Sequence, residues 1–339
     1  MKFGEHVPLA PLTTLGVGGK ARFFIEAHSE EDVKAAIARA RECGLPVLPL
    51  GGGSNLLVPD AGVDGVVVKV MMRDIACEEG GAETLLVAGA GASWETVVDT
   101  ATSRGLFGIE NLAGIPGTIG GAAVQNIGAY GAELAGVFAY ADTVDAATGS
   151  SRRIARDEAA FGYRTSFFKN NRSHIVTRVA LRLSTHASPN ISYPDLLRAQ
   201  EEGVSLTAPV DIAKAVRAIR ARKFPKQAEE GSAGSFFKNP VISRELASAL
   251  AERFPGMPQF PQPDGTVKVS LAWLLDRALS LKGFSKGNAR LYEKHPLVIV
   301  ARAGARAADI DALAKEVAEL VRSATGIAIE REVETFGAR

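Results

Sequence analysis

The sequence LAGIPGTIGGAAVQNIGAYG, residues 112–131, constrains the fold more than any other stretch of this chain. It is dense in glycine, carries no charged residue, and follows neither the period of an amphipathic helix nor the alternation of a half-buried strand. A connection of this length is usually functional rather than a simple turn. Glycines let a backbone approach a ligand closely, and the missing charge suits an apolar ring system. We therefore expect this stretch to wrap a ligand, with a buried structural loop as the alternative.

A second glycine motif, GGGSN at residues 51–55, lies between predicted strands at 45–50 and 66–70. Residues without side chains let successive backbone amides surround an anion such as a phosphate, although a flexible turn would have the same composition. The segment GAGASW at 89–94 lacks the third glycine of the dinucleotide fingerprint, and no stretch matches the P-loop. A dinucleotide bound by this chain would therefore not use a Rossmann domain.

The remaining pattern mixes helices and strands. Ser29 and Gly44 bracket a predicted helix, with Asp32 placed for a capping box. Further helices are predicted after Ser93 and at residues 211–223, 243–254, 271–279 and 309–324, and strands at 84–90, 175–183, 297–300 and 327–333, with a hairpin at 144–154. A polar, glycine-containing segment after residue 224 suggests a domain boundary, and a length of 339 residues at roughly 150 per domain predicts two or three domains.

The composition is that of an ordinary folded protein with balanced charge. Its 39 Lys and Arg residues against 38 Asp and Glu residues create no global field for nucleic acid. No apolar run approaches the ~20 residues needed to cross a bilayer, and the N-terminus lacks a signal-like apolar core, so we expect a cytoplasmic protein without a membrane partner. Cys43 and Cys77 are too few for a disulfide framework, and the histidines lack metal-ligand spacing. We expect reduced thiols and no metal, so demanding chemistry would need an organic cofactor or acid and base side chains.

A few polar residues are candidates for chemistry. Arg164 ends the sequence FGYR, and a guanidinium can grip a carboxylate through two parallel hydrogen bonds. Ser235 lies beside a glycine in AGSFFKNP, and either residue taken alone is equally well explained as part of the surface. Glu330, Glu332 and Glu334 alternate in the predicted last strand and would share one face, so spacing does not choose among them.

Together these segments resemble the UDP-N-acetylenolpyruvoylglucosamine reductase family, also called UDP-N-acetylmuramate dehydrogenases, nearly from end to end. The motifs are TTLGVGGKA at 13–21, LGGGSN at 50–55, ENLAGIPGTIGGAAVQNIGAYG at 110–131, FGYR at 161–164, GSFFKNP at 234–240 and IEREV at 329–333. The resemblance implies an α+β protein with a vanillyl-alcohol-oxidase-type FAD-binding fold of two subdomains and a C-terminal α+β substrate domain. The expected bounds are 1–70 for the first subdomain, joined by the C-terminal strand 327–339, then 71–223 for the second and 224–326 for the substrate-binding domain.

The resemblance also implies site residues. Arg164, Ser235 and Glu332 match the family's catalytic arginine, serine and glutamate. The expected FAD contacts are Gly51, Gly52, Gly53, Ser54 and Asn55 at the diphosphate, and Ile115, Pro116, Gly117, Gly120, Gly121, Asn126 and Gly128 around the rest of the cofactor. The expected substrate contacts are Tyr130, Tyr193, Lys223, Asn239 and His295, of which Tyr193 matches a substrate-covering tyrosine found in one of the family's two loop types. Two positions depart from the family pattern, because Glu334 replaces a frequent arginine near the flavin and His295 replaces a glutamine.

The implied activity is that of a cell-wall oxidoreductase. FAD and NADPH would serve to reduce UDP-N-acetylglucosamine enolpyruvate to UDP-N-acetylmuramate, a peptidoglycan precursor. Negative charge develops on the substrate carboxylate during hydride addition, so we expect Arg164, with Glu332 beside it, to stabilise this charge and Ser235 to donate the proton. We expect non-covalent FAD, because neither glycine stretch has a histidine or cysteine, and a monomer. The alternatives are a flavin oxidase of the same fold and a catalytically dead nucleotide-sugar sensor.

Overall fold

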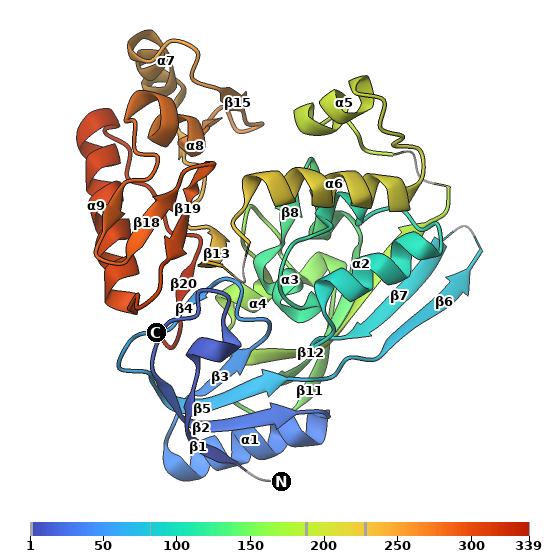
Figure 1. The fold of residues 1–339 in the computed structure, drawn as a ribbon. Helices are drawn as coiled ribbons and strands as arrows, with labels where there is room; N and C mark the ends of the chain where they lie inside the picture. The colour runs from blue at the N-terminus through green and yellow to red at the C-terminus, as the bar shows by residue number, and fades with distance from the viewer. Residues whose placement is uncertain (1–2, 82, 187–188, 227–228, 339) are drawn as a thin grey trace. The chain divides into compact units, whose positions relative to one another are not determined.

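The computed structural model describes residues 3–81, 83–186, 189–226 and 229–338. The chain forms two compact units, coloured along the sequence in Figure 1. Unit 1 comprises Met1–Val7, Ala21–Gly53 and Asp64–Ala221, and unit 2 comprises Pro8–Lys20, Ser54–Val63 and Arg222–Arg339. Each unit is built around its own cluster of buried apolar side chains, so each is described by itself below.

The first sheet of unit 1 has four strands in the order β1-β2-β5-β3. Their bounds are Gly4–Pro8, Lys20–Ala27, Val63–Val70 and Val47–Leu50, respectively. Helix α1, Glu30–Cys43, buries Val33, Ala36, Ile37 and Ala40, the spacing of one helix face. The predicted capping box between Ser29 and Asp32 is confirmed, and Gly44 ends the helix in the left-handed conformation.

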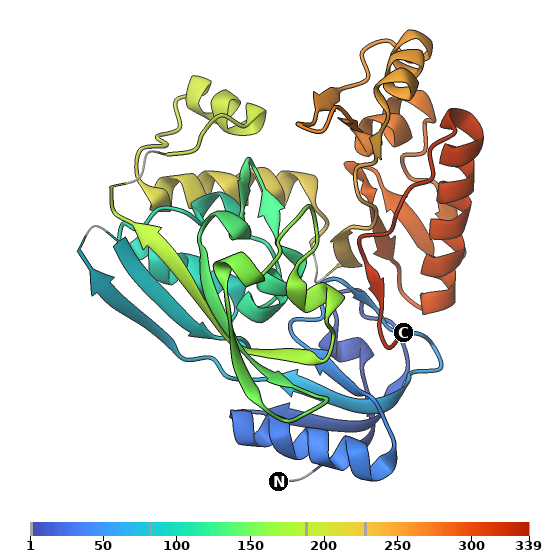
Figure 2. The ribbon, with the colours of Figure 1, turned by 180° about the vertical axis from the view of Figure 1, so that it is seen from behind.

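The second sheet of unit 1 has five antiparallel strands in the order β11-β10-β12-β7-β6. Their bounds are Ser151–Ala155, Phe138–Asp145, His174–Ser184, Glu83–Gly89 and Ile75–Gly80, which Figure 2 shows from behind. The predicted hairpin at 144–154 and strand at 175–183 are therefore confirmed. The helices of this part are α2 (Trp94–Ser103), α3 (Ile119–Gln125), α4 (Phe167–Asn170), α5 (Pro194–Glu201) and α6 (Pro209–Lys223).

The glycine stretch at 112–131 is not wholly irregular, contrary to the prediction from its periodicity. It contains α3, a helix of 7 residues whose N-terminus is capped by the Thr118 side chain and whose end is marked by Asn126 at a φ of 43°. A short hairpin of β8 (Gly128–Ala129) and β9 (Ala132–Glu133) follows. Gly120 makes the helix possible here, because a Cβ at this position would lie 2.8 Å from the Cβ of Ala90. A helix this short, with glycines in its buried face, gives no apolar period to detect.

Unit 2 contains a four-stranded sheet in the order β13-β19-β18-β17 and a three-stranded sheet in the order β14-β16-β15. The first comprises Gly231–Ser235, His295–Ala301, Ala289–Tyr292 and Ser285–Lys286, and the second Val241–Ile242, Val267–Val269 and Gln259–Pro261. Its helices are α7 (Arg244–Arg253), α8 (Leu271–Trp273) and α9 (Ala307–Thr325). The helix predicted at 271–279 changes character after α8, because Leu274–Ala278 forms a π-helical turn.

The C-terminal segment differs from the prediction of a strand at 327–333. These residues, all of them described, form no regular strand: Arg331 makes an isolated antiparallel bridge with Phe237, Lys238 N donates to Glu330 O at 2.9 Å, and Glu332 N donates to Phe236 O at 2.8 Å. A regular strand follows only at β20, Glu334–Thr335, which pairs in parallel with β4, Leu56–Leu57. Glu330 is exposed and paired with Lys238, whereas Glu332 and Glu334 are partly buried, so the glutamates do not share one environment.

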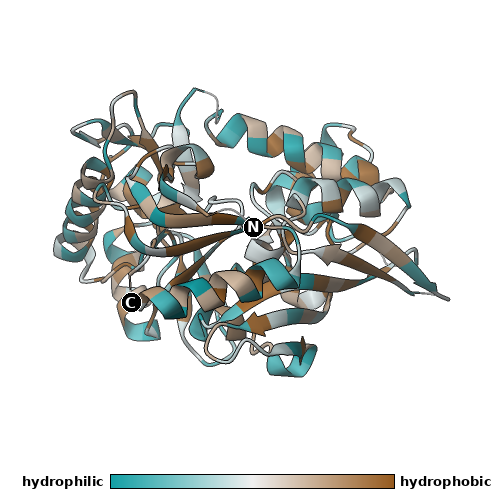
Figure 3. Cartoon of the chain, turned by 90° about the horizontal axis from the view of Figure 1, so that it is seen from below, coloured by the Kyte–Doolittle hydropathy of each residue, from teal (hydrophilic) through white to brown (hydrophobic). Residues whose placement is uncertain are grey.

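The hydropathy pattern agrees with this division into sheets and covering helices. In Figure 3 the strands carry long hydrophobic stretches, while the helices alternate hydrophobic and hydrophilic residues. Cys43 and Cys77 are free and partly buried. None of the helices within the described ranges combines the length and the apolar character that crossing a membrane requires.

Candidate functional site

Two glycine segments of unit 1 lie in direct contact. A Cβ added to Gly51 would lie 2.8 Å from Thr118 Oγ1, and one added to Gly52 would lie 2.5 Å from the Cα of Gly117. Any side chain at these positions would push the segments apart, so glycine is required by the packing and not only by turn geometry. The structure therefore brings together the two glycine segments that are far apart in the sequence.

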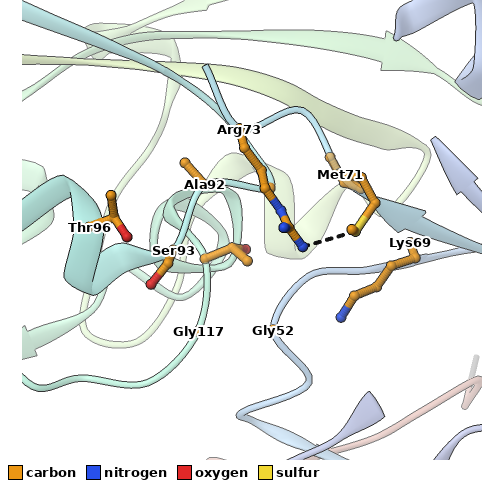
Figure 4. A pocket seen from close by; sticks show the side chains of 11 residues that line it. Gly52, Lys69, Met71, Arg73, Ala92, Ser93, Thr96 and Gly117 are labelled. Atoms are coloured by element: carbon orange, nitrogen blue, oxygen red, sulfur yellow. Dashed lines mark hydrogen bonds between the residues drawn. The ribbon is translucent and has the colours of Figure 1, made fainter. Parts of the chain in front are cut away.

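A pocket of about 430 Å³ opens beside this contact (Figure 4). It is lined by Gly52, Lys69, Val70, Met71, Arg73, Gly91, Ala92, Ser93, Thr96, Gly117 and Thr118, all of which belong to unit 1. Lys69 and Arg73 are the only charged side chains among these described lining residues, and both are basic. Neither residue lies in the glycine motifs from which the cofactor contacts are predicted. Exposed main chain and positive charge together suit a phosphate-bearing ligand.

Ser93 was predicted to cap α2, and the structure gives its side chain another place. The helix begins at Trp94 as expected, but within the described part of the chain the Ser93 hydroxyl accepts no capping hydrogen bond and instead lines the pocket. Trp94 N donates to Gly117 O at 3.0 Å, which attaches the first turn of α2 to the second glycine segment. The start of α2 is therefore part of the pocket wall.

The predicted cofactor residues outside the pocket have structural roles of their own. Asn55 lies in unit 2, where its Nδ2 donates to Glu332 O at 2.9 Å and its carbonyl accepts from Glu334 N at 3.1 Å. In unit 1, Asn126 donates to Gly162 O at 3.0 Å and accepts from Ala135 N at 3.0 Å. Both side chains thus hold neighbouring backbone in place.

Arg164 is held by the end of the glycine stretch. Its Nη2 donates to Gly128 O at 2.7 Å, and its own carbonyl accepts from Lys169 Nζ at 3.1 Å. The residue adopts a φ of 55°, a left-handed conformation that costs energy in a non-glycine residue and often marks a functional position. The guanidinium of this predicted catalytic residue is therefore positioned by main chain that also belongs to the predicted cofactor region.

Tyr130 and Tyr193 meet edge to face, with ring centroids 5.1 Å apart. Tyr130 is buried, whereas 39% of Tyr193 is exposed. Burial raises the pKa of Tyr130 to about 12, although Arg220, which is hydrogen-bonded to it, acts in the opposite direction. Asn111 Nδ2 donates to Tyr130 O at 2.8 Å and to Asn190 O at 2.7 Å, which ties the Tyr193 loop to the glycine stretch. The sequence motifs assign no role to Arg220 or Asn111, because both act through partners distant in the chain.

In unit 2 the structure brings Ser235 and Glu332 onto adjacent segments. Ser235 ends β13, where it pairs with Val298 of β19, and it follows Gly234 at a φ of 70°. The backbone hydrogen bond from Glu332 N to Phe236 O at 2.8 Å places the glutamate next to the end of this strand. Arg331 is fixed by an ion pair with Asp311 at 2.8 Å, so the segment carrying Glu332 is anchored on both sides.

The remaining predicted substrate residues also belong to unit 2. Asn239 Oδ1 accepts a hydrogen bond from Leu271 N at 3.0 Å at the start of α8. His295 begins β19, and its ring lies 5.2 Å from that of Phe224, while Lys223 ends α6. The predicted catalytic and substrate residues are thus divided between the units. Arg164, Tyr130 and Tyr193 belong to unit 1, and the rest belong to unit 2: Ser235, Glu332, Lys223, Asn239 and His295.

Comparison with known proteins agrees with the division into a cofactor part and a C-terminal part. Residues 21–154 match the FAD binding domain family, and residues 226–336 match the family of the UDP-N-acetylenolpyruvoylglucosamine reductase C-terminal domain. These matches, with the solved relative described next, confirm the predicted fold class, an FAD-binding fold with a C-terminal α+β domain.

Relatives cover the whole chain. The chain is 39% identical to the UDP-N-acetylenolpyruvoylglucosamine reductase of Pseudomonas aeruginosa over 335 residues, 98% of both proteins, and 39% identical to that of Chromobacterium violaceum over 341 aligned positions, again 98% of both. It is similar to the crystal structure of UDP-N-acetylenolpyruvylglucosamine reductase from Thermus caldophilus, with a TM-score of 0.69, 31% identity and 99% of each chain covered. The chain belongs to the UDP-N-acetylenolpyruvoylglucosamine reductase family.

Proposed function

We propose that this protein reduces UDP-N-acetylglucosamine enolpyruvate to UDP-N-acetylmuramate, with NADPH as the hydride source and FAD as the cofactor, in the synthesis of peptidoglycan precursors. The observation that carries the proposal is the pocket beside the contact of two glycine segments, because it lies in the part of the chain matched by the FAD binding domain family. The end-to-end likeness to reductases of this name supports the choice of substrate.

The pocket residues fit FAD. Gly52, Gly91 and Gly117 present main chain without a side chain to the pocket, and the lining is basic and otherwise uncharged in its described residues. Bound FAD would supply the hydride-carrying ring, while residues 115–121 and Gly128 would enclose it. We propose that residues 1–70 with 327–339 and residues 71–223 form the two FAD-binding subdomains, and that 224–326 form the substrate domain. We propose non-covalent attachment, which acid precipitation tests by releasing all of the yellow colour.

The protein's own groups have separate tasks in the proposed reaction. Negative charge develops on the substrate carboxylate as hydride reaches the methylene carbon, and the Arg164 guanidinium, together with Glu332, would stabilise and orient that group. Ser235 would donate a proton to the neighbouring carbon and be recharged through solvent. The support for these roles is the fixed backbone around Arg164 in unit 1 and around the Ser235–Glu332 pair in unit 2.

The proposed substrate contacts would have different tasks. Tyr193, exposed and resting edge-on against Tyr130, would cover the substrate as its loop closes. Tyr130, Lys223 and Asn239 would bind the diphosphate and nucleoside portion, and His295 would also contact the substrate. We propose that the enzyme acts as a monomer in the cytoplasm, where NADPH and nucleotide sugars are available, and light scattering of the purified protein tests the first part.

An anaerobic titration tests the proposed function. NADPH should bleach the flavin absorbance of the purified protein, and the enolpyruvyl UDP-sugar should restore it without oxygen. A flavin that returns only when oxygen is admitted would instead support an oxidase. A protein that binds the UDP-sugar but never reoxidises with it would support a sensor.

A further inference from the structure

The pocket contains a lysine whose position follows from the sheet beside it. In the parallel pairing of β3 with β5, Lys69 lies opposite Leu50, the residue before the glycine turn. From this position its side chain reaches the turn, and Nζ donates to Gly51 O at 2.5 Å. Figure 4 shows Lys69 and Arg73 entering the same space beside Gly52 and Gly117. The pairing of β3 with β5 therefore sets the positions of both the glycine turn and the Lys69 ammonium.

We propose that Lys69 is the principal cationic ligand of the diphosphate of the dinucleotide cofactor, and that the same side chain holds the Gly51–Gly53 turn in its binding shape. The proposal rests on the proposed function, because it takes FAD as the cofactor. It assigns to this chain a charged residue at the diphosphate, beyond the backbone amides of the glycine motif.

The electrostatic surroundings support this role. Burial lowers the pKa of Lys69, the nearby Arg73 lowers it further, and Glu26 acts in the opposite direction. A partly buried ammonium beside a second cation is unfavourable until an anion arrives. A diphosphate in the pocket would relieve both the lost hydration and the repulsion, and a hydrogen bond between two ionised groups is among the stronger ones. Lys69 is thus placed where ligand binding improves its environment.

Arg73 is the natural comparison within the same pocket. Its side chain is exposed, and its Nη2 lies 3.5 Å from the Met71 sulfur rather than against the glycine turn. A cation in water is screened and contributes little to binding. We therefore expect Arg73 to strengthen FAD binding by no more than a few-fold, and Lys69 to make the larger contribution.

Two substitutions separate the charge of Lys69 from its hold on the turn. Lys69→Gln keeps an amide donor for the Gly51 carbonyl but removes the charge, whereas Lys69→Met removes both. Each full-length holoenzyme is diluted in steps, and the free FAD is measured by its recovered fluorescence to give Kd. The lost charge-assisted hydrogen bond predicts a rise in the FAD Kd of about tenfold to a hundredfold in both variants.

ADP, which has the diphosphate but no flavin, then locates the effect. ADP should displace FAD from the wild-type protein. The Kd of ADP should rise in Lys69→Gln by the same factor as the Kd of FAD. Added salt should weaken wild-type binding more steeply than binding by this variant. Lys34→Gln, an exposed position on α1 in the same unit, is the matched control and should leave every value unchanged.

The outcomes are distinguishable. A wild-type protein that binds no FAD contradicts the proposed function itself. If the wild type and Lys69→Gln bind FAD with the same Kd, the inference about Lys69 is wrong, but the proposed function is not contradicted. If Lys69→Gln behaves as wild type and only Lys69→Met loses FAD, the side chain merely braces the turn, and the charge role is wrong. Thermal melting of each variant shows whether a loss reflects unfolding.

Discussion

In unit 1 the candidate FAD-binding surface consists largely of main chain, whereas in unit 2 the proposed proton donor is a side chain at the end of a strand. Gly51 and Gly52 serve by having no side chain, because two backbone segments approach each other there. Ser235, the proposed proton donor, would act through its hydroxyl, and its backbone is fixed by the pairing of β13 with β19. Close backbone contact and the Lys69 charge would therefore determine binding in the first region, and the Ser235 hydroxyl would determine reactivity in the second.

This difference has a kinetic consequence. A substitution in the glycine contact should change how much FAD the protein holds and affect both half-reactions through that loss. A substitution at Ser235 should leave the FAD content unchanged and affect one half-reaction. The predictions below test this separation, beginning with the largest expected effect.

Ser235→Ala should divide the two half-reactions. Reduction of the flavin by NADPH places no proton on carbon and should proceed at the wild-type rate. Reoxidation by the enolpyruvyl sugar requires a positioned acid, and its loss should slow this step by ~10²- to 10⁴-fold. Stopped-flow absorbance follows each step separately. Ser232→Ala, in the same strand, is the control and should behave as wild type; a normal Ser235→Ala or a defective Ser232→Ala would remove Ser235 as the proton donor.

Arg164→Lys should lower kcat/KM by about tenfold to a hundredfold although the charge is kept. An ammonium cannot donate to Gly128 O and also grip a carboxylate with the planar fork of a guanidinium. Steady-state assays at full FAD occupancy measure the change. Arg156→Lys provides a matched control, because Arg156 is exposed and also donates to a glycine carbonyl, that of Gly136 at 3.2 Å. Similar losses in both variants would contradict a special role for Arg164.

The parts of the fold that depend on local signals could be predicted from the sequence. Helix α1 follows from Ser29, Asp32, Gly44 and a single buried face, all within one short segment. Helix α3 could not be found in this way, because it has 7 residues and its packing requires glycine rather than an apolar stripe. The strand predicted at 327–333 has apolar alternation, but its backbone hydrogen bonds go irregularly to residues 236–238.

The difference between local and long-range signals also explains which site residues could be predicted from the sequence. The motifs identified Ser235 and Arg164 because these residues stand inside distinctive local sequences. Lys69 was missed because its partner, Gly51 O, is set by the parallel pairing of β3 and β5, and the adjacent sequence does not specify that register. The role of Asn111 was missed for a similar reason. Its side chain connects Tyr130 to Asn190, which lies 79 residues after Asn111 in the sequence.

Gly52→Ala should weaken FAD binding by roughly tenfold or more, because the new methyl group would displace the Gly117 backbone and overpacking of this kind costs about 1–3 kcal/mol. The FAD Kd of the full-length protein measures the effect, and both half-reactions should recover when FAD is supplied in excess. Gly136→Ala is the control, since an added Cβ there meets no atom within 4 Å. A half-reaction that stays selectively slow at saturating FAD would break the proposed separation between the two regions.

Tyr193→Phe should give the smallest effect and bears on a third kind of contact, a side chain that we propose moves over the substrate. The phenyl ring keeps the edge-to-face packing on Tyr130, so the loop should still close. Only a hydroxyl hydrogen bond to the substrate is lost, which predicts a rise in KM for the UDP-sugar of about 2- to 10-fold. KM for NADPH should change less, because the lid acts on the sugar. Tyr140→Phe is the control and should leave both constants unchanged, because Tyr140 lies on β10 with its ring under the guanidinium of Arg153 on β11. Equal changes in the two constants for Tyr193→Phe would show that the tyrosine is not a substrate lid, and would place it with the residues that shape the binding surface of unit 1.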